Sequence, residues 1–159
     1  ICEIRGDSRM LNQSEVQSII RKILSSSKAE ETEISLGGGT ATHLRFARNT
    51  PSTSGTSENV VLSIRSTFGK RSGSATVNQL DESSIKEAVH KSEELAQLSP
   101  EDPEFVPALG PQRYPKVSAF YEKTARSGAD FLARGAEACI RQAAAKDLVA
   151  AGFLRVNAQ

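Results

Sequence analysis

Residues 60–68 read VVLSIRSTF, and this stretch decides the fold class of the chain. In an extended backbone Leu62 and Ile64 point to one side, whereas Ser63 and Arg65 point to the other. Strict alternation of apolar and polar residues indicates a β-strand with one buried and one solvated face. The segment therefore predicts a sheet that is covered on one side only.

Three further runs have the same strand character, and they flank this segment along the chain. They are residues 33–36, 43–47 and 74–78. We expect the strands to break at the glycines 37–39, in a polar loop at 50–57 and in a hairpin turn at 69–71. Short connections between consecutive strands favour an antiparallel meander.

A helix precedes the strands, because apolar residues between Val16 and Leu24 recur with helical spacing. Asn12 is the predicted N-cap, and Glu15 three residues later completes a capping box. A second helix is predicted to begin after Asp81 and to end near Ser99. Its inner stripe consists of Ile85, Ala88, Val89, Ser92 and Ala96.

A third helix is predicted over residues 129–150, with Gly152 as its C-cap, followed by a strand at 153–156. We expect that strand to lack a partner in this chain and to begin a truncated domain. The fold class is therefore α+β: a mainly antiparallel four-stranded sheet with helices packed on one face. The expected element order is α-β-β-β-β-α-α-β.

The proline distribution predicts how the chain is divided into domains. Five of the six prolines lie between Pro100 and Pro115, and proline fixes φ and removes a hydrogen-bond donor. We expect an N-terminal α/β domain at 1–99, a proline-rich connector at 100–127, and a helix with the start of a following domain at 128–159.

Composition excludes several classes of protein. The 159 residues carry 20 Lys and Arg and 19 Asp and Glu, a net charge of +1, which argues against a polybasic nucleic-acid binder. The apolar runs are far shorter than the roughly 20 residues needed to span a bilayer. The two cysteines, Cys2 and Cys139, form no disulfide framework and no CxxC motif, which favours the reducing cytoplasm.

The sequence contains no recognisable catalytic or metal-binding motif. His43 and His90 are its only histidines, and neither belongs to an HExxH pattern. Gly39-Thr40 leads into a strand rather than a helix, so the glycines 37–39 do not form a phosphate-binding loop. A GxSxG nucleophile elbow is also absent. We therefore predict no catalytic residue and no metal ligand in this chain.

A basic strand face is the most informative charge feature. Residues 42–80 hold five cations and one anion, and Arg45 and Arg65 are predicted to point away from the core. Two interpretations remain open: a solvated outer face in which arginine blunts a sheet edge, or a docking surface for another domain, a subunit or a peptide backbone. Single-stranded nucleic acid is disfavoured because no aromatic platform is interleaved.

One stretch resembles a known family. Residues 45–49, RFARN, resemble the R-F-A-N-N segment of the TldD/PmbA family, the modulators of DNA gyrase. The glycine turn and small-residue strand at 69–78, the helix at 80–89 and the proline-rich exit at 100–105 are similar in order and spacing. Arg48 departs from the family pattern, which usually has Asn there.

The resemblance implies an N-terminal domain of a longer cytoplasmic protein. Active members of the family are zinc metallopeptidases that act on unfolded or leader peptides, and they pair with an inactive homologous subunit. Their zinc motif follows this region, so no metal or catalytic residue carries over. The resemblance implies a domain that shapes the substrate chamber, with Arg45, Asn49 and Arg65 as candidate peptide or interface contacts.

The implied partners are a TldD/PmbA-type subunit or a second copy, and a peptide substrate, but neither nucleic acid nor a membrane. An alternative reading is a binding or assembly module without catalysis, such as an inactive PmbA-like partner or a modulator of DNA gyrase.

Overall fold

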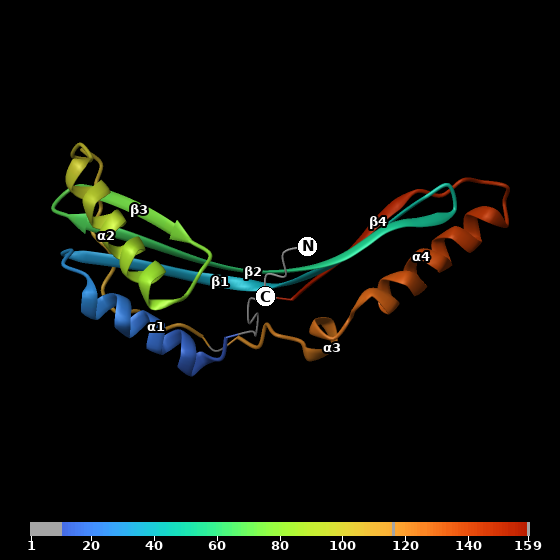
Figure 1. The fold of residues 1–159 in the computed structure, drawn as a ribbon, viewed down its shortest axis with the longest axis horizontal. Helices are drawn as coiled ribbons and strands as arrows, with labels where there is room; N and C mark the ends of the chain where they lie inside the picture. The colour runs from blue at the N-terminus through green and yellow to red at the C-terminus, as the bar shows by residue number, and fades with distance from the viewer. Residues whose placement is uncertain (1–10, 116, 159) are drawn as a thin grey trace. The chain divides into compact units, whose positions relative to one another are not determined.

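The computed structural model describes residues 11–115 and 117–158, and Figure 1 shows the arrangement of their elements. The elements are α1 (Gln13–Ser26), β1 (Glu31–Ala47), β2 (Thr50–Phe68), β3 (Arg71–Val77), α2 (Glu82–Leu98), α3 (Glu122–Ala125), α4 (Ala129–Ala144) and β4 (Gly152–Ala158). The strands form a four-stranded sheet in the order β3-β2-β1-β4, and β2 pairs antiparallel with β3 and β1 with β4. The predicted α+β class with a mainly antiparallel sheet is confirmed.

The described chain divides into two compact units, and β1 and β2 contribute residues to both. Unit 1 contains residues 11–38 and 60–115, with α1, α2 and β3. Unit 2 contains residues 39–59 and 117–158, with α3, α4 and β4. Each unit has its own hydrophobic cluster. The division into domains at residues 100 and 128 stays a prediction.

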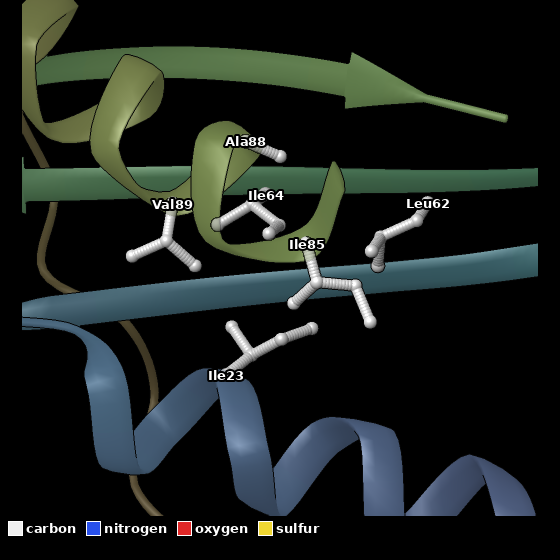
Figure 2. Packing of buried hydrophobic residues seen from close by; sticks show 6 residues of the cluster. All are labelled: Ile23, Leu62, Ile64, Ile85, Ala88 and Val89. Atoms are coloured by element: carbon white, nitrogen blue, oxygen red, sulfur yellow. The ribbon is translucent and has the colours of Figure 1, made fainter. Parts of the chain in front are cut away.

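The core of unit 1 lies between two helices and the inward face of β2. Its buried side chains point toward one another in Figure 2; they are Ile23 of α1, Leu62 and Ile64 of β2, and Ile85, Ala88 and Val89 of α2. Complete burial of one such Ile or Leu side chain is worth about 1.5–3 kcal/mol. The alternation of residues 60–68 therefore fixes which face of β2 the helices cover.

Both long helices of unit 1 begin where the sequence predicts. The side chain of Asn12 accepts a hydrogen bond from the Glu15 amide at 3.0 Å, and Glu15 Oε2 accepts one from the Asn12 amide at 2.7 Å. These two bonds form the predicted capping box. Asp81 caps α2 by accepting from the Ser84 amide at 3.0 Å, and Ser99 ends that helix. All five residues of the predicted inner stripe of α2 are buried.

Helix α2 packs very closely on β2 and β3. The hydroxyls of Ser66 and Ser92 form a buried hydrogen bond of 2.8 Å, and Ser92 also donates to the Val89 carbonyl at 2.8 Å. Gly73 of β3 lies directly beneath the helix, where a Cβ atom would collide with the backbone of Ser92 and Ala96. Only glycine fits this crossing without moving the helix.

Two predicted strand breaks are wrong. The glycines 37–39 lie inside β1, and the predicted polar loop at 50–57 is the first half of β2. The chain turns instead at Arg48 and Asn49, whose φ angles of 51° and 60° are those of a type I′ hairpin. Serine hydroxyls hold the polar strand, because Ser52 and Ser54 donate to the carbonyls of Arg45 and His43.

The predicted end of the third helix is also wrong. Helix α4 stops at Ala144 rather than at residue 150, and Gly152 begins β4 instead of capping the helix. The amides of Asp147 and Leu148 donate to the carbonyls of Ala144 and Ala143, which is the pattern of a Schellman cap. Asp147, rather than the predicted Gly152, takes the left-handed position after the helix, with φ 56°.

The last strand has a partner, contrary to expectation. Residues 152–158 pair with residues 40–46 of β1, with Leu154 opposite Leu44. The inward residues of this strand complete the cluster of unit 2, so the strand is an integral part of that unit.

No helix within residues 11–115 and 117–158 is long and apolar enough to cross a membrane. Cys139 lies on α4 as an exposed free thiol, whereas Cys2 lies outside the described residues.

We expect Gly73→Ala to destabilise the chain by about 1–3 kcal/mol, because its Cβ must push α2 away from the sheet. Urea unfolding followed by circular dichroism measures this change. Gly37→Ala is the matched control, because nothing lies within 4 Å of its added Cβ. Equal unfolding midpoints for the two variants would contradict the close helix crossing.

Hydrogen bonds from Ser83 and Ser84 hold the pKa of Asp81 well below its usual range. The folded-state pKa is thus lower than the unfolded value of about 3.9, so the ionised cap stabilises the fold above that pH, and the contribution is lost as pH falls below it. We expect Asp81→Asn to lower the urea midpoint at pH 7 and to lower it progressively less as the pH falls from about 4 towards about 2. Parallel midpoint-against-pH curves for the two proteins would refute this assignment.

Candidate peptide-binding surface

The candidate surface is the outer face of the sheet in unit 2, and the packing of α4 decides which side chains reach it. Leu44 and Phe46 of β1 are buried against Leu132 and Ala136 of α4. Because side chains alternate along a strand, the odd-numbered neighbours of Leu44 must point away from the helix. The position of His43 and Arg45 on the outer face follows directly.

Two consecutive cross-strand pairs make up the centre of this face. Arg45 lies opposite Phe153, and His43 lies opposite Arg155. The Arg45 guanidinium carbon sits 5.5 Å from the centre of the Phe153 ring, a cation–π contact. The His43 ring stacks on the same phenyl ring with 5.9 Å between centroids and 25° between planes. We call His43, Arg45, Phe153 and Arg155 the basic platform.

The neighbouring strand β2 leaves room for this arrangement. A Cβ atom on Gly55 would come within 3.1 Å of His43 Cε1, so the imidazole lies directly over the glycine. The nearby hydroxyls of Ser52 and Ser54 donate to β1 carbonyls. The imidazole is therefore held between Gly55 and Phe153.

The arginines of the platform are exposed, and their donors are only partly used. Arg155 Nε donates to Asn157 Oδ1 at 2.8 Å. Within the part of the chain that the structure describes, neither Arg45 nor Arg155 forms an ion pair. Phe153 is 52% exposed, which is high for a phenylalanine. The platform thus presents free guanidinium donors around an accessible ring.

The three predicted contact residues occupy different environments. Arg45 belongs to the platform, whereas Arg65 is exposed on β2 in unit 1, opposite Ser74 of β3. Asn49 sits in the β1–β2 turn, and its side chain bonds main-chain groups on both sides of Val149. Its Nδ2 donates to the Leu148 carbonyl at 3.1 Å, and its Oδ1 accepts from the Ala150 amide at 2.7 Å. A role for these residues in contacting a peptide stays a prediction.

Phe153, Arg155 and His43 are the surface residues that sequence reasoning missed. A pairing partner for the last strand would have revealed them, because it places residues 153 and 155 beside residues 45 and 43. The sequence analysis also predicted that no aromatic side chain lies among the cationic residues. That prediction is wrong, because the Phe153 ring contacts both Arg45 and His43.

An apolar pocket of about 470 Å³ lies in the same unit, between α4 and β4. Its lining residues are Phe131, Leu132, Arg134, Gly135, Leu154, Arg155 and Val156. The lining is mostly apolar and includes Leu132 of α4 and Leu154 and Val156 of β4. Such a lining can accommodate an apolar side chain.

The described residues offer no metal site. Across 11–115 and 117–158, no three His, Cys, Asp or Glu side chains come together in a group that could hold an ion. His43 lies on β1 in the platform, and His90 is exposed on α2. The His, Cys, Asp and Glu side chains of the described residues therefore do not fit a catalytic zinc ion, which needs three protein ligands.

Comparison with known proteins identifies the class. Residues 32–96 match the family model described as PmbA/TldA metallopeptidase domain 1. The fold is similar to TldE from Thermococcus kodakarensis, with a TM-score of 0.75, 22% identity, and coverage of 88% of this chain and 32% of TldE. It is also similar to a candidate modulator of DNA gyrase from Bacteroides thetaiotaomicron, with a TM-score of 0.70 and 15% identity over 93% of this chain and 40% of that protein.

A second candidate modulator of DNA gyrase, from Thermotoga maritima, matches with a TM-score of 0.64 and 10% identity, over 89% of this chain and 35% of that protein. A comparison with curated proteins found no significant match. The chain thus spans about a third of the length of the solved structures it resembles. The resemblance to the N-terminal domain of the TldD/PmbA family, which the sequence predicted, is confirmed by the match over residues 32–96 and by the similar folds.

We expect Asn49→Ala to destabilise the chain by about 2–3 kcal/mol. The substitution removes two hydrogen bonds to the 148–150 segment, and alanine is unfavourable at φ 60°. Arg48→Gly is the companion variant. It should stabilise the turn by about 0.5–1 kcal/mol, because glycine adopts φ 51° without strain. Urea midpoints measure both. A neutral Asn49→Ala would show that this side chain does not hold the turn.

Proposed function

We propose that this chain is the N-terminal domain of a TldD/PmbA-type metallopeptidase, or of the subunit that pairs with such an enzyme. The enzyme would act on unfolded or leader peptides in the cytoplasm. The match of residues 32–96 to the family's first domain carries this proposal. In it, zinc is bound outside the described residues, and this domain contributes substrate contacts and shapes the chamber. No chemical step is assigned to the chain itself.

Strand addition is the mode of peptide contact that we propose for this domain. β4 stands at one end of the strand order, so one of its edges has no neighbouring strand in the described sheet. An extended peptide can pair with such an edge through main-chain hydrogen bonds, and pockets beside it then select alternate side chains. The apolar pocket between α4 and β4 lies beside this strand and could receive one of those side chains.

Such an edge favours extended chains, because most backbone groups of a folded protein are already paired. This physical selection supports a domain that admits unfolded substrates and excludes folded ones. The proposal retains a TldD/PmbA-type subunit or a second copy as the protein partner, and the boundaries at residues 100 and 128 as domain limits.

A second candidate is an assembly module without catalysis. Two of the similar solved structures are described as candidate modulators of DNA gyrase, and this observation favours the alternative. In that case the protein would act by binding, and no peptidase activity would accompany it.

The test is a peptidase assay with zinc analysis on the protein encoded by the complete reading frame, alone and mixed with any TldD/PmbA homologue from the same genome. We expect hydrolysis of an unstructured peptide, loss of hydrolysis with a chelator, and no hydrolysis by the 159-residue chain. A complete protein that binds no zinc and cleaves nothing, with or without its homologue, would reject the peptidase and leave the assembly module.

A further inference from the structure

We propose that the basic platform of unit 2 binds an extended acidic peptide, with two carboxylates two residues apart held by Arg45 and Arg155. The inference rests on the proposed function, since it names the chemistry of the peptide that this domain receives. It concerns the face of the sheet, whereas strand addition concerns its edge.

The spacing of the two arginines matches the repeat of an extended peptide. Arg45 is opposite Phe153, and Arg155 is the next residue on the same face of β4, so the two arginines are diagonal neighbours. Diagonal neighbours on one sheet face are about 7–8 Å apart. Side chains at positions i and i+2 of an extended chain lie on one side and are about 6.6 Å apart. The backbone positions of Arg45 and Arg155 thus have nearly the same spacing as side chains i and i+2 of an extended peptide, which is why we propose carboxylates at those two positions.

Both arginines are held ready for such a ligand. The Phe153 ring supports the Arg45 guanidinium at 5.5 Å, and Asn157 accepts from Arg155 Nε at 2.8 Å. The terminal nitrogens of Arg155 stay available as donors. A planar guanidinium binds a carboxylate through two parallel hydrogen bonds, and less side-chain entropy is lost when the group is already oriented.

Charge complementarity selects an acidic partner. The three strand segments that form this part of the sheet, residues 40–47, 50–57 and 152–158, contain no Asp or Glu. Arg45, Arg155 and the adjacent His43 thus face solvent without a carboxylate from these three segments. An incoming peptide supplies the missing negative charge, and Phe153 offers apolar surface to the methylenes between its carboxylates.

A peptide fits this surface better than a nucleic acid does. Binding of single strands relies on several stacking rings along a cationic groove, and this platform holds one phenyl ring. The net charge of the whole chain is only +1, which gives weak attraction to a polyphosphate backbone.

The binding test uses the 159-residue chain and fluorescein-labelled nine-residue peptides, with affinity measured by fluorescence anisotropy at 50 and 150 mM salt. The probe carries Glu-Ser-Glu at its centre. One comparison peptide carries Gln-Ser-Gln, and another carries Glu-Glu-Ser with unchanged charge and altered spacing. We expect the first peptide to bind about tenfold more tightly than the Gln peptide and more tightly than the Glu-Glu peptide.

Arg45→Gln and Arg155→Gln should each weaken binding of the Glu-Ser-Glu peptide about tenfold. Arg141→Gln is the control: Arg141 is an exposed residue of α4, and its substitution removes the same charge but should leave binding unchanged. Arg45→Lys keeps the charge without the planar fork and should fall between wild type and Arg45→Gln. Unfolding midpoints of all variants are compared with wild type, and Arg155→Gln supplies the result if one variant at position 45 fails to fold.

Three outcomes overturn the inference: equal affinity for the Glu and Gln peptides, an equal loss with Arg141→Gln, or tighter binding of a labelled oligonucleotide than of the acidic peptide. Because this assay needs neither zinc nor hydrolysis, its result is separate from that of the peptidase test. A complete protein that cleaves peptides without any preference for Glu-Ser-Glu would retain the proposed function and remove this inference.

Discussion

The structure depends on one constraint, which is the two-residue alternation of side chains along β1 and β2. In unit 1 the even-numbered residues Leu62 and Ile64 are buried beneath α1 and α2, and in unit 2 Leu44 and Phe46 are buried against α4. Burial of one face leaves the odd-numbered residues Arg45 and Arg65 to solvent, because a strand cannot change this register without exposing its whole apolar set. The chemistry of the outer face is thus fixed by packing on the inner one.

Much of unit 1 could be predicted from sequence because its signals are local. Asn12 and Asp81 satisfy the free amides of the next turn, and the stripe on α2 follows from helical spacing within a single element. The turn beginning at Gly69 also carried its own signal, since its φ of 59° suits glycine. Local hydrogen bonding and periodicity were sufficient at these positions.

Unit 2 could not be predicted as well, because its structure depends on contacts between residues about a hundred positions apart. Asn49 binds the main chain at 148 and 150, and β4 pairs with β1. The hairpin turn at 48–49 lacks glycine, and the polar residues 50–57 become a strand where serine hydroxyls bond the adjacent backbone. The sequence therefore singled out Arg45 but could not predict the basic platform, because only the pairing of β4 with β1 brings Phe153 and Arg155 beside His43 and Arg45.

The glycines and the exposed arginines of this domain serve different purposes: the glycines allow close packing, whereas the arginines are available for contacts with a ligand. Gly73 and Gly152 lie where a Cβ would collide with α2 or with Phe46, so these positions serve packing. Arg45 and Arg155 are exposed, form no ion pair within the described chain, and lie on the side of the sheet away from the core. Folding gains little from such side chains, since exposed charges contribute little to stability. Phe153 and Asn157 orient these two side chains and leave terminal guanidinium nitrogens exposed, which is the arrangement on which the proposed acidic ligand depends.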